Sequence, residues 1–278
     1  MIPLRDESRR PVGFPIVTTF IIAINVLVFI LELSGGDAFV TRWSVVPADI
    51  VAGRHWITIL TAMFMHGSWL HIAGNMVFLW AFGPEIEDAM NPWRYAAFYL
   101  AGGVVAMLAQ IAANPASTIA CLGASGAIAA VMGGFLVTYP RYKIRTVLLI
   151  GWLARITFIP AALLIGFWFL IQLLRVGAVA DVQSGGVAYL AHIGGMIFGA
   201  VTARLFEDPR RLAEQQTEDR SSVLGVTLAP DSIGRCRFTS RSRERSTGRG
   251  SCTLDHDPMR FTNSGSAIDR FGTMKSYT

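Results

Sequence analysis

Long apolar stretches alternate with short polar segments along the chain up to residue 206. A bilayer core of about 30 Å is crossed by about 20 helical residues, and six stretches span this length or nearly so. The pattern therefore predicts an all-α, polytopic membrane protein with a bundle of six transmembrane helices. The predicted helices cover residues 15 to 34, 69 to 83, 93 to 113, 124 to 139, 156 to 176 and 187 to 206.

The overall composition supports this interpretation. Apolar residues make up 53% of the 278 residues and charged residues only 15%, whereas a soluble domain averages roughly 25% charged residues. We therefore expect a multi-pass integral protein of the plasma or inner membrane, embedded in the lipid bilayer.

Basic residues near the predicted helix ends gather on one side of a six-span arrangement. Loops rich in Lys and Arg stay in the cytosol, so we expect both termini to be cytoplasmic. The first stretch has no small-residue cleavage site and is predicted to be an uncleaved anchor. The basic residues on the cytosolic side are Arg5, Arg9, Arg10, Arg94, Arg141, Lys143, Arg145, Arg155, Arg204, Arg210 and Arg211.

The chain changes character from residue 207. The segment 240–250 is rich in Ser, Arg and Gly without an apolar period, so it cannot bury enough surface to fold alone. We therefore predict a membrane domain of residues 1–206 and a mostly disordered cytoplasmic tail of residues 207–278. The net charge of +5 mostly reflects membrane topology. We expect no nucleic-acid partner, and weak contact with anionic lipid is the alternative role for the Arg-rich run.

A serine and a histidine lie within predicted membrane helices. Ser125 is part of Gly-Ala-Ser-Gly at the head of the fourth stretch, and His192 is part of Ala-His-Ile-Gly-Gly in the sixth. A polar group in hydrocarbon costs several kcal/mol unless it is paired or used. The two residues are therefore candidates for a nucleophile and its base.

Small residues repeat at four-residue intervals beside both candidates. In the fourth stretch the series are Ser125, Ala129, Gly133 and Gly126, Ala130, Gly134, and in the sixth the pair is Gly195, Gly199. Such faces let helix backbones approach closely. If the two faces meet, the Ser125 hydroxyl comes within about 3 Å of a His192 ring nitrogen. For Ser125 alone, a helix-packing role is the alternative.

The remaining polar residues suggest how the reaction is supported. Acids outside the tail lie in loops or at helix ends, so we predict a Ser-His dyad with His192 oriented by packing. His71 and Asn75 share a helical face, and with the Ser125 backbone N–H they are candidates for holding an oxyanion. His66 is predicted to be a structural hydrogen-bonding residue. Because the spacing of His66 and His71 is not HExxH, we expect no metal and no cofactor.

Taken together, these residues resemble the rhomboid family of intramembrane serine proteases over residues 14 to 206. The resemblance rests on residues 60–76 (LTAMFMHGSWLHIAGNM), 123–126 (GASG) and 191–195 (AHIGG) with Gly199. It implies a six-helix fold, an active site open to the extracytoplasmic side, and cleavage of transmembrane segments of other proteins without metal or nucleotide.

By position, the resemblance makes Ser125 the nucleophile, His192 the general base, and His71 and Asn75 the oxyanion donors. Structural or packing roles fall to His66, Gly123, Gly126, Gly195 and Gly199. It also implies that the first loop, residues 35 to 68, lies partly in the membrane, and that the third-to-fourth loop and the fifth span with Trp168 border substrate entry.

Two positions depart from the pattern of some relatives. Ala129 stands where some members carry an aromatic residue that stacks on the histidine, and Ile57-Thr58 stands where others carry Trp-Arg. Both departures concern the positioning of the histidine and the stability of the first loop.

Two other functions fit a chain of this kind. A catalytically silent relative would bind membrane helices for quality control, although such proteins typically lack the serine or the histidine. A small transporter would show internal repeats, and none is seen between the two halves.

Overall fold

The computed structural model describes residues 2–6, 13–150, 153–179, 189–215, 226–230 and 236–240. The chain forms two compact units, Met1–Ala213 and Glu214–Thr278. The predicted tail of residues 207–278 lies mostly outside the described residues. Within it, residues 209–215 are helical, and β4 (Val226–Pro230) pairs antiparallel with β5 (Cys236–Ser240). The disorder expected of the rest of the tail stays a prediction.

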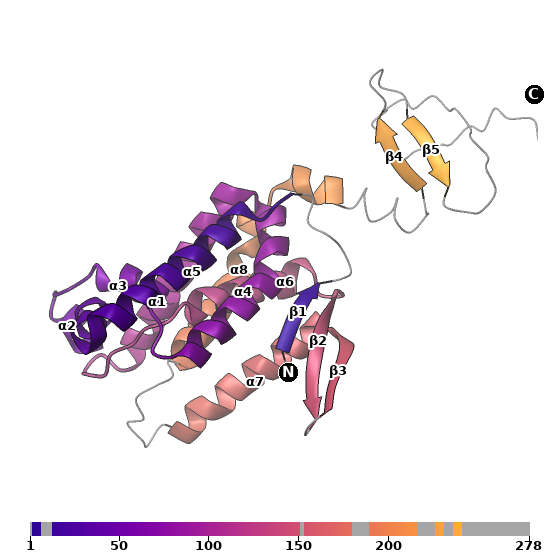
Figure 1. Ribbon diagram of the computed structural model, residues 1–278. Helices are drawn as coiled ribbons and strands as arrows, with labels where there is room; N and C mark the ends of the chain where they lie inside the picture. The colour runs from indigo at the N-terminus through magenta and orange to yellow at the C-terminus, as the bar shows by residue number, and fades with distance from the viewer. Residues whose placement is uncertain are drawn as a thin grey trace, which may run out of the picture. The chain divides into compact units, whose positions relative to one another are not determined.

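The first unit is mostly helical (Figure 1). One longer helix lies at each predicted apolar stretch, and α1, α5 and α8 are long and apolar enough to cross a membrane by length and composition. The six-span count stays a prediction. The longer helices are α1 (Ile16–Trp43), α4 (Trp69–Met90), α5 (Pro92–Ala113), α6 (Ser125–Thr138), α7 (Ala161–Val179) and α8 (Tyr189–Phe206). The shorter ones are α2 (Pro47–Val51), α3 (Thr58–Thr61) and the 3-10 turn η1 (Ala62–Phe64).

Local chemistry sets where α4 and α5 begin. The Ser68 side chain accepts a hydrogen bond from the His71 backbone N–H, which caps α4. Asn91 separates α4 from α5 with a positive φ of 65°. Its side chain caps α5 by accepting from the Arg94 N–H, and Pro92 occupies the first turn. The cap at Ser68 therefore fixes the turn of α4 that carries His71.

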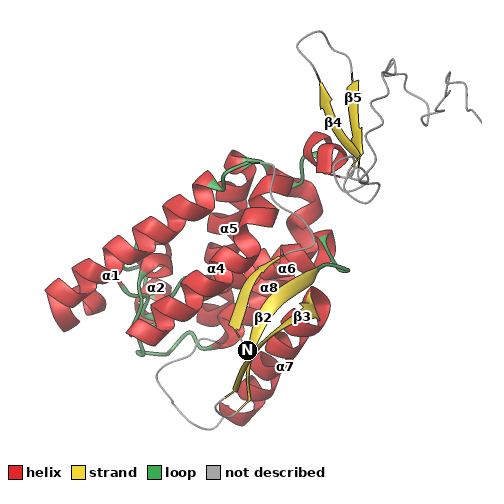
Figure 2. Cartoon of the chain, turned by 45° about the vertical axis from the view of Figure 1, so that its right-hand side comes forward, coloured by secondary structure: helices red, strands yellow, loops and turns green. Residues whose placement is uncertain are grey.

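A small sheet corrects the all-α prediction. Strands β1 (Ile2–Asp6), β2 (Lys143–Ile150) and β3 (Leu153–Pro160) form an antiparallel sheet in the order β1-β2-β3, which lies beside α7 (Figure 2). The fifth stretch was predicted to be helical from residue 156, but α7 begins at Ala161. Within a helix from 156, Pro160 would remove a hydrogen bond, and β-branched residues such as Ile156 favour a strand.

Helix α6 packs against α4, α5 and α8, most extensively against α8. The two small-residue faces meet: a Cβ added to Gly195 would overlap the Gly126 carbonyl oxygen, and one added to Gly199 would overlap the Ala130 carbonyl oxygen. Only backbones without an intervening side chain approach this closely. Because residues at the starts of α6 and α8 contact each other, as do residues at their ends, the two helices run parallel.

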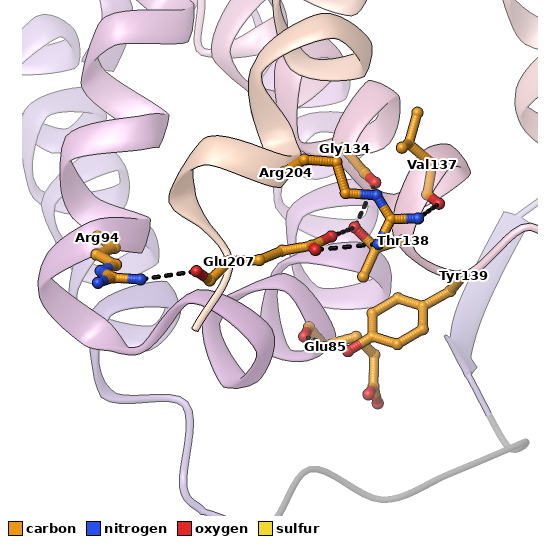
Figure 3. A network of polar contacts seen from close by, with 8 residues as sticks. All are labelled: Glu85, Arg94, Gly134, Val137, Thr138, Tyr139, Arg204 and Glu207. Atoms are coloured by element: carbon orange, nitrogen blue, oxygen red, sulfur yellow. Dashed lines mark hydrogen bonds and ion pairs between the residues drawn. The ribbon is translucent and has the colours of Figure 1, made fainter. Parts of the chain in front are cut away.

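The ends of α6 and α8 are joined by a polar network (Figure 3). The Glu207 carboxylate accepts from the Thr138 hydroxyl at 2.8 Å and from the Arg204 guanidinium at 3.0 Å. Arg204 also donates to the Val137 carbonyl at 3.0 Å, and Arg94 donates to the Glu207 carbonyl at 2.7 Å. The buried carboxylate of Glu207 thus ties α6 to α8, and the backbone carbonyl of the same residue adds the start of α5.

Candidate active site

Ser125 is held at the first position of α6 by the loop before it. This loop pairs with the first loop through reciprocal hydrogen bonds between Val45 and Cys121, of 3.0 and 2.7 Å. The Gly123 N–H donates to the Ala62 carbonyl at 2.8 Å. These backbone contacts fix the level at which α6 starts, and with it the position of the Ser125 hydroxyl.

Gly123 shapes the turn that precedes Ser125. Its φ of +133° is in a region that residues with side chains rarely adopt. A Cβ at this position would lie 3.0 Å from the imidazole of His71 and 3.5 Å from the Ser125 hydroxyl oxygen. The glycine therefore gives both the backbone turn and the space in which the His71 ring lies close to Ser125.

The structure brings Ser125 and His192 together. The Ser125 Oγ is 2.7 Å from His192 Nε2, which is within the reach that a nucleophile and its base require. His192 is buried in the first turns of α8. The contact joins residues 67 positions apart across the α6–α8 interface, where the glycines remove the side chains that would otherwise separate the helices.

A third residue, Gln172 of α7, completes this chain of contacts. Its Oε1 is 2.8 Å from His192 Nδ1, and its Nε2 donates to the Trp168 carbonyl at 3.3 Å. Gln172 was not predicted from the sequence, because the usual partner of such a histidine is a carboxylate. The available signal was the same one that pointed to Ser125, namely a polar side chain inside an apolar stretch.

Aromatic rings lie near His192 although residue 129 is an alanine. The Trp168 ring centroid is 5.4 Å from that of His192 with a tilt of 43°, and the Tyr189 ring lies edge-on at 6.5 Å. These rings come from α7 and α8, whereas an aromatic at 129 would come from α6. The histidine therefore has ring neighbours despite the departure at Ala129.

Three further predicted residues form one cluster beside the dyad. Asn75 Nδ2 lies 2.9 Å from His66 Nε2, and the rings of His66 and His71 meet edge to face at 5.1 Å. His71 lies on the Ser125 side of this cluster, next to Gly123. Asn75 is buried, and its amide group is engaged by His66, whereas the His71 ring lies beside the turn that precedes Ser125.

An acid of α1 anchors this cluster. Both carboxylate oxygens of Glu32 accept from the His66 backbone N–H, at 3.0 and 3.1 Å, and Glu32 is buried. Glu32 lies near the end of the first predicted helix, and no role was predicted for it from the sequence. A carboxylate at the end of an apolar stretch was the available signal, because a buried charge needs partners.

The second departure, at Ile57-Thr58, leaves the first loop held by other contacts. Thr58 is buried and its hydroxyl donates to the His55 carbonyl at 2.7 Å. The Thr61 hydroxyl donates to the Trp43 carbonyl at 2.9 Å, which ties the loop to the end of α1. Hydroxyl-to-carbonyl bonds thus hold this part of the loop.

A small cavity of about 10 Å³ adjoins Ser125. Its lining includes Gly123, Gly126 and Ser125, with Met63, Met107 and Leu122 as the larger side chains. The volume matches one water-sized group. Across the described parts of the chain, His, Cys, Asp and Glu side chains form no group of three or more that could hold a metal ion.

Comparison with known proteins finds one matching family model and several relatives of similar sequence. A family model described as a Rhomboid domain matches residues 53–208. The chain is 27% identical over 220 residues to Rhomboid protease GluP of Bacillus subtilis, covering 74% of this chain and 39% of that protein. It is 28% identical over 188 residues to Rhomboid protein 1, mitochondrial, of Saccharomyces cerevisiae, covering 65% of this chain and 50% of that protein. The chain thus spans half or less of the length of these two relatives.

Proposed function

Because the chain belongs to the rhomboid family, we propose that it is an intramembrane serine endopeptidase that cleaves transmembrane segments of other membrane proteins. The observation that carries the proposal is the 2.7 Å contact between Ser125 Oγ and His192 Nε2. A serine that only packed between helices would not need an imidazole within hydrogen-bonding distance of its hydroxyl. In the proposed enzyme, Ser125 is the nucleophile and His192 is the general base.

The proposed reaction has two halves. His192 Nε2 takes the Ser125 proton while Oγ attacks the scissile carbonyl, and the resulting imidazolium returns a proton to the leaving amine as the peptide bond breaks. A water molecule, deprotonated by the same imidazole, then hydrolyses the acyl-enzyme. The site must therefore admit water, and the small cavity beside Ser125 supports this requirement.

The oxyanion would be held at the start of α6. The proposed donors are the backbone N–H of Ser125, the imidazole of His71, which lies beside Gly123, and the side chain of Asn75, which contacts His66. Each such donor contributes about 3 kcal/mol to stabilisation of the transition state. The free N–H groups of the first turn of α6 and its dipole add a positive partial charge where the negative charge develops.

The substrate must expose a carbonyl that an intact helix keeps hydrogen-bonded. We therefore propose a transmembrane segment whose end is weakly helical, rich in Gly, Ala or Pro, and unwinds to reach Ser125. The small cavity favours a small side chain next to the scissile bond. The proposed topology places both termini in the cytosol and the site on the opposite side, with residues 1–206 as the protease domain.

The proposal is tested by co-expressing the chain with a tagged single-span reporter that carries a Gly/Ala-rich helix end. The native chain is compared with Ser125→Ala and His192→Ala by immunoblot. A product that appears only with the native chain supports the proposal. No product from several reporters that still co-purify with all three forms supports a helix-binding protein instead, and a product that survives Ser125→Ala refutes the assigned nucleophile.

A further inference from the structure

We propose that Gln172 is a positioning residue that holds His192 in the tautomer and orientation that Ser125 requires. The inference rests on the proposed function, and it supplies the third partner for which the sequence offered no carboxylate. It concerns a neutral amide on α7, a helix that contributes neither the nucleophile nor the base.

The hydrogen bonds of Gln172 fix the direction of its amide. Nε2 donates to the Trp168 carbonyl at 3.3 Å, one turn earlier in α7, so Oε1 points to His192. Oε1 can only accept, so the proton of the neutral imidazole lies on Nδ1. His192 Nε2 then presents its lone pair to the Ser125 hydroxyl 2.7 Å away. The opposite tautomer would leave no acceptor for the serine proton.

Because both side chains are buried, the imidazole of His192 has few alternatives to Gln172 as a hydrogen-bond partner. Gln172 and His192 are each 7% exposed, so water competes weakly for either partner. A buried hydrogen bond that loses one partner leaves the other unsatisfied, which opposes any rotation of the imidazole away from Oε1. A neutral acceptor also avoids burying a charge, whereas a carboxylate here would need further partners.

Two contacts of the histidine come from α7. Trp168 packs on the imidazole ring at 5.4 Å and Gln172 binds its edge, so the orientation of the base depends on α7 lying against α8. Among the described residues, the titratable groups near His192 are His71 of α4 and Tyr189 of its own helix. Helix α7 contributes a neutral group, so replacing Gln172 by an acid changes the charge beside the base.

The experiment compares Gln172→Leu and Gln172→Glu in the full chain with Leu27→Ala as the control. Leu27 lies on α1, away from the span that is expected to border substrate entry, with 57% of its surface exposed. The readouts are kcat and KM for the reporter and the rate at which a fluorophosphonate labels Ser125, both across pH. Thermal unfolding checks that each variant is folded.

We expect Gln172→Leu to lower kcat and the labelling rate about 10- to 100-fold with KM nearly unchanged. Gln172→Glu should recover most of the rate and move the acidic limb of the profile to higher pH, because a carboxylate stabilises the imidazolium. Leu27→Ala should match the native chain. Native rates in Gln172→Leu, or equal losses and unchanged pH limbs in both Gln172 variants, would overturn the inference.

A second measurement does not depend on activity. In the Ser125→Ala background, ¹⁵N NMR of labelled histidines should show His192 protonated at Nδ1, and adding Gln172→Leu should shift the population toward protonation at Nε2. An unchanged tautomer would contradict the role of Gln172. If the native chain neither cleaves nor reacts with the probe, the proposed function fails, and the tautomer still decides the role of Gln172.

Discussion

The two ends of the parallel pair α6 and α8 are joined by different chemistry. At their starts, the neutral side chains of Ser125 and His192 meet at 2.7 Å. At their ends, the Glu207 carboxylate binds Thr138 and Arg204, and Arg204 also binds the last turn of α6 (Figure 3). One end uses neutral hydrogen bonds and the other uses charge.

The helix dipole favours cations at one end and a transient anion at the other, whereas it opposes the Glu207 carboxylate, which its bonds to Arg204 and Thr138 offset. The C-terminal ends of two parallel helices both carry negative partial charge, so guanidinium groups that bind their carbonyls are favourable there. The N-terminal ends both carry positive partial charge, which repels a fixed cation but stabilises a transient oxyanion. A permanent charge beside His192 would also alter its readiness to take a proton. The charged end therefore anchors the helices, while the neutral end would leave the proposed base free to react.

The largest expected effect comes from removing the nucleophile at the neutral end. Ser125→Ala should lower reporter cleavage by at least about 1,000-fold while the free energy of unfolding stays close to native. Thr138→Ala, at the other end of the same helix, is the matched control and should retain cleavage. Similar cleavage losses in both variants would show that α6 acts through its packing rather than through the hydroxyl.

The second largest effect is expected from forcing α6 and α8 apart at a point between their two ends. A Cβ at Gly199 overlaps the Ala130 carbonyl oxygen, so Gly199→Ala must push α8 from α6 and lengthen the Ser125–His192 contact. A displacement of about 1 Å can lower catalysis about 100-fold. Kinetics on the purified variant measure this loss.

The chain offers a matched control for this substitution. Gly13, before α1, has nothing within 4 Å of an added Cβ, so Gly13→Ala should leave cleavage unchanged. Native activity in Gly199→Ala would mean that the glycine contact does not set the distance between serine and histidine.

A smaller effect is expected from the charged end. Glu207→Ala removes the acceptor of Thr138 and Arg204 and should lower the free energy of unfolding by about 2 kcal/mol. Cleavage by the folded protein should stay within about threefold of native, since the dyad lies at the other end. Unfolding curves and kinetics on the same preparation separate these quantities, with Glu207→Gln as an intermediate. A selective loss of kcat without loss of stability would show that the two ends are coupled.

The smallest expected effect is a pH dependence of stability at the charged end. The backbone N–H of Arg210 and the amide of Asn91 bind the Asp208 carboxylate and lower its pKa below the ordinary value of 3.8. A folded-state pKa that is lowered stabilises the fold at pH values above the ordinary pKa. This stabilisation is lost as the pH falls through the folded-state pKa.

Asp208→Asn tests that pH dependence. It should lower the unfolding temperature slightly at pH 7, and the difference from the native chain should vanish in acid. A difference that is constant with pH would assign the effect to the neutral hydrogen bonds.

The sequence predicted what local patterns encode. Apolar length located the six longer helices, and the small residues at four-residue intervals indicated the face on which Ser125 and His192 meet. The contacts of Gln172 and Glu32 were not predicted, because Gln172 joins two helices and Glu32 joins α1 to the loop before α4, and no local pattern specifies how these parts are placed. The sheet was not predicted because the sequence of β3 is as apolar as that of a predicted transmembrane helix. Its pairing with β2 is what selects the strand over the helix.

The pairing of β1 also bears on the order in which the chain assembles. Ile2 pairs with Val147, so β1 must wait for a partner that is synthesised after α6. Closing so long a loop is slow relative to local structure. Helices α1, α4, α5 and α6 can therefore all be synthesised before β1 pairs with β2. Strand β1 is thus among the last elements of the first unit to adopt its folded position.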